Sequence, residues 1–107
     1  MATVTIDITN QTGYQLRVQS ASTTGSWDTV PQGYIELGES ASFQALGGDS
    51  LQGRISFTPY RSAGSYEVRF EITDNDIRTA TRVPATHTQE VATTGAWPDF
   101  GLTVVFK

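Results

Sequence analysis

The chain has 107 residues and a formal net charge of −4, and Lys107 is its only lysine. Nucleic-acid binders carry clustered Lys and Arg, so this balance argues against a nucleic-acid partner. It contains no cysteine, which excludes disulfide frameworks, thiolate metal sites and cysteine nucleophiles. Sixteen threonines and ten glycines favour strands and turns, so we expect one all-β domain spanning residues 1–107.

Alternating apolar residues predict the strands of the N-terminal half. Residues 3–9 alternate with one apolar face, and a second alternating run covers 14–19. The turn-forming segment 10–13 lies between them, so the two runs are predicted to pair as a hairpin. Further strands are expected at 27–30, 34–37 and 40–46.

The C-terminal half has the same kind of pattern. Residues 54–60 alternate cleanly, and 66–72 is the strongest strand pattern in the chain. An aromatic loop is expected over 95–101, followed by a final strand at 102–106, whereas 79–91 fits no clear pattern. Eight to nine short strands with frequent turn signals predict an antiparallel two-sheet β-sandwich.

The predicted core consists of the apolar residues on the inward faces of these strands. The first and last strands are expected to lie at sheet edges, where they could pair between copies of the chain. The predicted core residues are Val4, Ile6, Ile8, Leu16, Val18, Phe43, Ile55, Phe57, Val68, Phe70, Ile72, Leu102, Val104 and Phe106.

Few residues are available for catalysis or metal binding. His87 is the only histidine, and no Gly-x-Ser-x-Gly pattern accompanies it, so no enzyme is expected. The run Asp74-Asn75-Asp76, with Thr79 after it, resembles half of the calcium motif of βγ-crystallin domains. A turn that caps a strand end explains the same residues. We therefore predict no metal and no cofactor, and keep a calcium-binding structural module as an alternative.

Five aromatic residues in or beside turn-rich segments are the candidate ligand-binding residues. Rings in loops settle at the headgroup level of a membrane or stack on sugars, but they also fill the ends of small sandwiches. The candidates are Trp27, Tyr34, Tyr60, Trp97 and Phe100.

The six arginines are expected on solvated strand faces, paired with nearby glutamates and otherwise available for phosphate contacts. Because a protein of net charge −4 is not attracted to anionic lipid, a membrane would have to be recognised through a specific headgroup, sterol or glycan. The arginines are Arg17, Arg54, Arg61, Arg69, Arg78 and Arg82.

Several motifs follow one another in residues 4–72. They are the turn Asn10-Gln11-Thr12-Gly13 after a strand, the segment Gly25-Ser26-Trp27, the step I-E-L-G-E-S-A-S-F at 35–43, and a glycine-containing turn into a strand over 51–57. This order resembles the aegerolysins and, more loosely, the actinoporins. The resemblance implies a cysteine-poor β-sandwich that binds specific membrane lipids. It also implies a cytolytic or insecticidal toxin, which in some members acts with a larger partner protein. On this resemblance, the residues nearest to the lipid-facing loop aromatics are Trp27, Tyr60 and Trp97.

We therefore expect a non-enzymatic protein that binds a membrane lipid through loop aromatics. A carbohydrate-binding lectin using the same rings is the alternative, and a homo-oligomer or a second protein component is a further expected partner. The chain does not open with a basic segment followed by an apolar run, and no apolar stretch is long enough to span a bilayer. Synthesis in the cytoplasm is expected, with later release left open.

Overall fold

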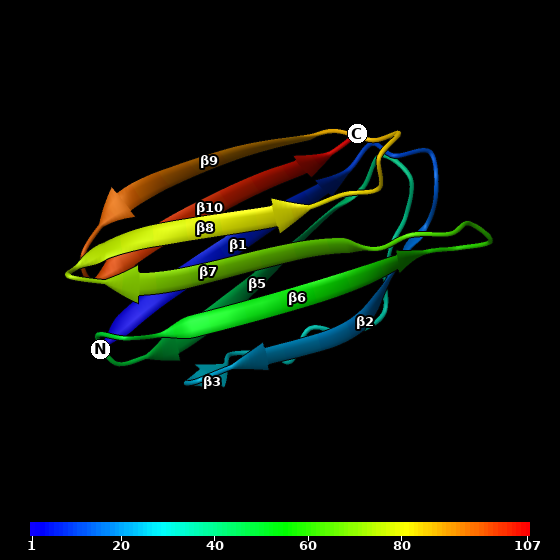
Figure 1. Ribbon diagram of the computed structural model, residues 1–107. Coiled ribbons are helices and arrows are strands. Elements are labelled where there is room, and N and C mark those ends of the chain that lie inside the picture. The colour runs from blue at the N-terminus through cyan, green and yellow to red at the C-terminus, as the bar shows by residue number, and fades with distance from the viewer.

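The computed structural model describes all 107 residues and is built from ten β-strands without a helix (Figure 1). The strands form two five-stranded sheets, in the orders β3-β5-β1-β10-β9 and β4-β2-β6-β7-β8. We call them the β1 sheet and the β6 sheet. No helix is present that could cross a membrane. The strands are β1 (Ala2–Asn10), β2 (Leu16–Thr23), β3 (Ser26–Trp27), β4 (Tyr34–Ile35), β5 (Ser40–Gly47), β6 (Gln52–Pro59), β7 (Tyr66–Thr73), β8 (Asp76–Arg82), β9 (Gln89–Ala96) and β10 (Asp99–Phe106).

The predicted all-β sandwich is confirmed, with ten strands rather than eight or nine. One hydrophobic cluster of eighteen buried residues fills the space between the sheets. Twelve of the fourteen predicted core residues are buried, and Val18 and Phe43 are half-buried against the same cluster. Each fully buried large apolar side chain contributes about 1.5–3 kcal/mol. Buried hydrophobic residues absent from the predicted core are Ala2, Ile35, Ala45, Leu51, Tyr66 and Phe100.

The predicted hairpin of the first two strands is wrong, because β1 and β2 lie in different sheets. The side chain of Asn10 is fully buried at the end of β1. Its Nδ2 donates to the carbonyl oxygens of Tyr14 (2.6 Å) and Ile35 (2.9 Å). Its Oδ1 accepts from the hydroxyl (2.7 Å) and the backbone N–H (3.1 Å) of Thr12. These bonds direct the chain out of the β1 sheet and tie it to β4 of the other sheet.

The expectation that the first and last strands lie at sheet edges is also wrong. β1 pairs with β10 in parallel, with Thr3 opposite Asp99 at one end and Asn10 opposite Phe106 at the other. All other strand pairs are antiparallel, and the edges are β3, β9, β4 and β8. A parallel pair needs a crossover, and here the crossover is most of the chain, so local patterns contain no sign of it.

The segment 79–91 contains the end of β8 and the start of β9, joined by a connection from one sheet to the other. Every residue of β9 is exposed, so this strand has no buried face to produce an alternating pattern. The aromatic loop expected over 95–101 is a short turn instead. Trp97 and Pro98 alone separate β9 from β10, and Phe100 lies inside β10.

Candidate functional site

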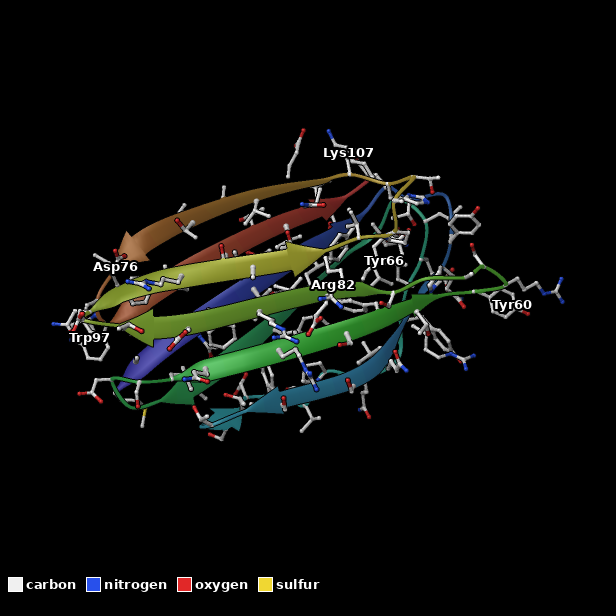
Figure 2. The ribbon with its side chains drawn as sticks, in the orientation of Figure 1. Tyr60, Tyr66, Asp76, Arg82, Trp97 and Lys107 are labelled. Atoms are coloured by element: carbon white, nitrogen blue, oxygen red, sulfur yellow. The ribbon has the colours of Figure 1, made fainter.

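The structure divides the five predicted aromatic residues between the two ends of the sandwich. Figure 2 shows Tyr60 and Trp97 at opposite ends of a molecule whose longest dimension is 39 Å. Phe100 is only 5% exposed, and Trp27 and Trp97 are half-buried against the core. Tyr34 and Tyr60 are 55% and 50% exposed. The five rings therefore do not form one surface, and only two of them project into solvent.

Tyr34 and Tyr60 lie at the same end as two further exposed side chains, Tyr14 and Leu37. We call these four residues the tyrosine end. They account for four of the seven exposed large hydrophobic residues of the chain. They come from separate segments, since Tyr14 precedes β2, Leu37 follows β4 and Tyr60 follows β6. Three chain connections therefore present amphipathic or apolar side chains at one end of the molecule.

Hydrogen bonds to the backbone hold these connections together. The Asn10 side chain bonds the carbonyl of Tyr14 and the carbonyl of Ile35, next to Tyr34. The backbone N–H of Tyr60 donates to the carbonyl of Gln15 (2.8 Å). The exposed tyrosines are therefore attached to a fixed backbone frame rather than to independent loops.

Two arginines lie against the exposed tyrosine rings. The guanidinium carbon of Arg17 is 5.1 Å from the ring centroid of Tyr34, and that of Arg61 is 5.2 Å from the ring centroid of Tyr60. These distances are within cation–π range. Neither arginine forms an ion pair with a carboxylate within 4.0 Å. The tyrosine end thus presents two positive charges beside its rings.

An aromatic cluster supports this end from beneath. The ring of His87 lies 5.9 Å from that of Tyr14 and 5.6 Å from that of Tyr66, and its Nδ1 is 2.9 Å from the carbonyl oxygen of Lys107. Tyr66 also packs edge-on against Phe106. The lone histidine is thus engaged in packing and in a backbone hydrogen bond.

Tyr66 is fully buried, and its hydroxyl has no hydrogen-bond partner within the protein. Burial raises the pKa of the Tyr66 hydroxyl. The Thr12 hydroxyl, which donates to Asn10 Oδ1 (2.7 Å) and not to Tyr66, lowers this pKa by its proximity, and the nearby Tyr14 raises it further.

Turn geometry explains the Asp74-Asn75-Asp76 run. Asp74 and Asn75 have φ angles of 54° and 61°, and Thr73 pairs with Asp76 across the β7–β8 hairpin. A two-residue hairpin turn with both central φ angles positive favours Asn and Asp. Asp76 Oδ1 accepts the N–H of Ile77 (2.9 Å). No group of three or more His, Asp or Glu side chains gathers where it could hold a metal ion.

The expected pairing of arginines with glutamates occurs at only two of the six. Arg54 and Arg69 both pair with Glu67, while the other four arginines have no carboxylate within 4.0 Å. The four are Arg17, Arg61, Arg78 and Arg82.

No family model matches the sequence, and no curated protein matches it either. The resemblance to aegerolysins stays a prediction from the motifs quoted above.

Sequence reasoning missed Tyr14 and Leu37 because it assigned both to strands. Each lies next to a glycine of positive φ, Gly13 at 84° and Gly38 at 77°. Such glycines mark tight turns, so adjacency to a turn glycine was the signal that could have found them.

Proposed function

We propose that the protein binds membranes through the tyrosine end, with Tyr14, Tyr34, Leu37 and Tyr60 placed at the headgroup level of a lipid bilayer. One observation carries the proposal. Amphipathic and apolar side chains from three separate chain connections are exposed together at one end, on a backbone frame held by hydrogen bonds.

The chemistry of these side chains suits the interface between headgroups and acyl chains. Tyrosine is amphipathic and is enriched at that level of the membrane, where its ring is shielded and its hydroxyl stays hydrated. Leu37 adds an aliphatic side chain that favours the acyl region. Four such side chains bury little area, so the binding is reversible rather than an insertion across the bilayer.

Charge indicates which lipid surface is preferred. The chain has net charge −4, so a strongly anionic bilayer repels the protein as a whole. Arg17 and Arg61 supply positive charge beside the tyrosine rings, where they can contact a lipid phosphate. We therefore expect zwitterionic phosphatidylcholine to be bound at least as well as mixtures rich in phosphatidylserine.

Vesicle co-sedimentation tests the proposal. Wild-type protein should sediment with phosphatidylcholine vesicles, and Tyr34→Ser, Leu37→Ser and Tyr60→Ser should each weaken partitioning by about fivefold to tenfold. Val91→Ser is the matched control, because Val91 is as exposed as Tyr14 but lies on β9, outside the tyrosine end. The proposal fails if wild-type protein sediments with no vesicle, or if Val91→Ser weakens binding as much as the other variants. Loading the same vesicles with a dye tests the cytolytic activity that the resemblance implies.

A further inference from the structure

The outer face of the β6 sheet carries most of the arginines of the chain. Side chains at outward positions of β2, β6, β7 and β8 include five of the six arginines but only three carboxylates, those of Glu67, Glu71 and Asp76. This face is therefore locally positive in a chain of net charge −4. Its arginines are Arg17, Arg54, Arg69, Arg78 and Arg82.

Two of these arginines face each other across a strand pair. Arg54 of β6 lies directly opposite Arg69 of β7 in the strand register. Like charges at directly opposed positions of a sheet destabilise it. Both guanidinium groups share the single carboxylate of Glu67, which is 2.7 Å from Arg69 Nε and 3.6 Å from Arg54 Nε.

The neighbouring strand adds arginines that have no ion-pair partner. Arg78 and Arg82 on β8 have no carboxylate within 4.0 Å. Arg78 is opposite Glu71 in register, but Glu71 Oε1 instead accepts a hydrogen bond of 3.4 Å from Gln52. The guanidinium of Arg78 is thus available to an external anion.

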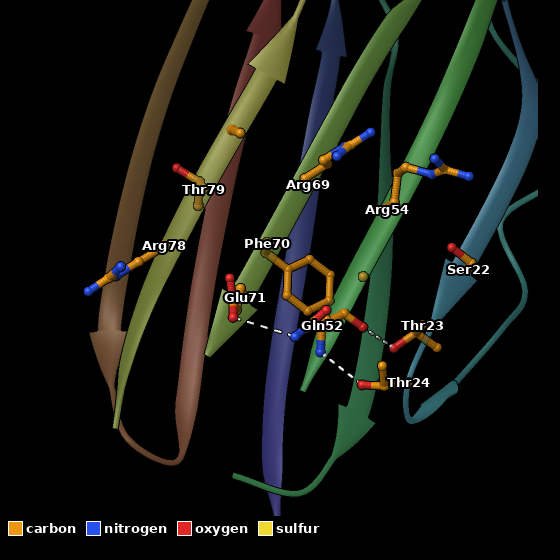
Figure 3. Close-up of a pocket in the computed structure, with 12 residues that line it drawn as sticks. Ser22, Thr23, Thr24, Gln52, Arg54, Arg69, Phe70, Glu71, Arg78 and Thr79 are labelled. Carbon is orange, nitrogen blue, oxygen red and sulfur yellow. Dashed lines mark hydrogen bonds between the residues drawn. The ribbon is translucent and has the colours of Figure 1, made fainter. Parts of the chain in front are cut away.

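A groove crosses this face between the arginines. Figure 3 shows its lining residues, which come from β2, β6, β7 and β8 and from the segment after β2. Its volume is about 510 Å³, within the range of about 300–1,000 Å³ typical of small-ligand sites. Three arginines contribute charge, and neutral hydroxyl and amide groups lie beside them. These lining residues are Arg54, Arg69, Arg78, Ser22, Thr24 and Gln52.

We propose that this groove binds carbohydrate carrying sulfate or phosphate esters. Guanidinium groups bind such oxyanions by paired hydrogen bonds, and three of them line this groove with only one carboxylate, that of Glu71. The hydroxyls and the amide next to them suit the hydroxyl groups of a sugar ring.

Two other ligands fit the groove less well. Single-stranded nucleic acid needs exposed rings on which bases stack, and the one aromatic residue of the groove, Phe70, is buried. A bilayer needs exposed apolar side chains, and none of the large exposed hydrophobic residues lines the groove. The site is separate from the tyrosine end and does not depend on membrane binding.

Isothermal titration calorimetry with a heparin-derived tetrasaccharide, its desulfated form and glucose 1,6-bisphosphate tests the site. The sulfated or the phosphorylated probe should bind, and the tighter of the two identifies the ester. Arg54→Gln and Arg78→Gln should each weaken binding about tenfold, and Glu71→Gln should tighten it by removing a negative charge from the groove. Lys107→Gln is the matched control, because it removes one positive charge outside the groove.

Four results would overturn the proposal. They are no binding of either charged probe, equal binding of the desulfated tetrasaccharide, equal weakening by Lys107→Gln, and tighter binding of a single-stranded oligonucleotide than of both charged sugars. Arg78 is exposed and unpaired, so Arg78→Gln should keep the melting temperature of the wild type. Loss of sugar binding in that variant would therefore come from the missing guanidinium in the groove and not from unfolding.

Discussion

Replacing Asn10 by alanine should be among the most damaging single substitutions in the chain. Asn10 is fully buried where β1 ends, and its side chain joins the two sheets through backbone groups of Thr12, Tyr14 and Ile35. Alanine keeps the strand but removes every one of these bonds. Buried carbonyl and N–H groups are then left without partners.

The hydrogen bonds of Asn10 determine how much free energy of unfolding is lost. The side chain takes part in five hydrogen bonds, four of 2.6–3.1 Å and one of 3.3 Å to the carbonyl oxygen of Glu36. Each contributes about 1 kcal/mol net, and an orphaned buried partner adds to the loss, so Asn10→Ala should lower the free energy of unfolding by about 3–5 kcal/mol. That is a large part of the about 5–15 kcal/mol that stabilises a typical domain.

Urea denaturation followed by circular dichroism measures the effect. Gln11→Ala is the matched control, because Gln11 is exposed and its side chain makes no hydrogen bond within the protein. The control should change the free energy of unfolding by less than about 0.5 kcal/mol. A loss below about 1 kcal/mol for Asn10→Ala would refute the idea that this side chain fixes the crossing between the sheets.

Two further substitutions test the buried hydroxyl of Tyr66 and the tight backbone approach at Gly95 of β9. Tyr66→Phe removes a buried hydroxyl without a partner, so the free energy of unfolding at pH 7 should stay equal or rise by up to about 1 kcal/mol, and a clear decrease would contradict the absence of a partner. Burial raises the pKa of Tyr66, so the folded state favours the neutral phenol. The wild type should therefore lose stability as pH rises above about 10, and Tyr66→Phe should lose less between pH 8 and pH 11 in urea denaturation. Gly95→Ala should cost more than about 2 kcal/mol by the same assay, since φ is 79° and the new Cβ would lie 2.4 Å from the carbonyl oxygen of Asp99. Gly48→Ala, with open space around its Cβ, is the control, and equal losses would contradict the clash.

The strands that could be predicted from sequence are those with one buried face. β1, β6, β7 and β10 alternate between buried residues and residues that are partly or fully exposed, and all four patterns could be recognised in the sequence. β9 is exposed on both faces, so it produced no pattern. The pairing partners of the strands could not be predicted either. The chain leaves the β1 sheet at Asn10, and β10, the parallel neighbour of β1, lies almost a hundred residues away in the sequence.

The sequence also could not show which of the candidate aromatic side chains reach solvent. Trp27 and Tyr34 look alike in sequence, since each opens a short predicted strand beside a turn-rich segment. Trp27 is opposite Ala45 and takes the inward face, whereas Tyr34 is opposite Arg17 and takes the outward face. The register of the pairing decides which ring reaches solvent, and a shift by one residue would exchange the faces.

Tryptophan fluorescence of a Tyr60→Trp variant tests membrane binding by the tyrosine end most directly. Trp27 and Trp97 are half-buried against the core, and Figure 2 shows Trp97 at the end opposite Tyr60. Phosphatidylcholine vesicles should therefore leave the emission of the wild type unchanged and shift that of Tyr60→Trp to shorter wavelength. A shift in the wild type, or sedimentation of Tyr60→Trp with vesicles without a shift in its emission, would show that another surface meets the lipid and would contradict the proposal.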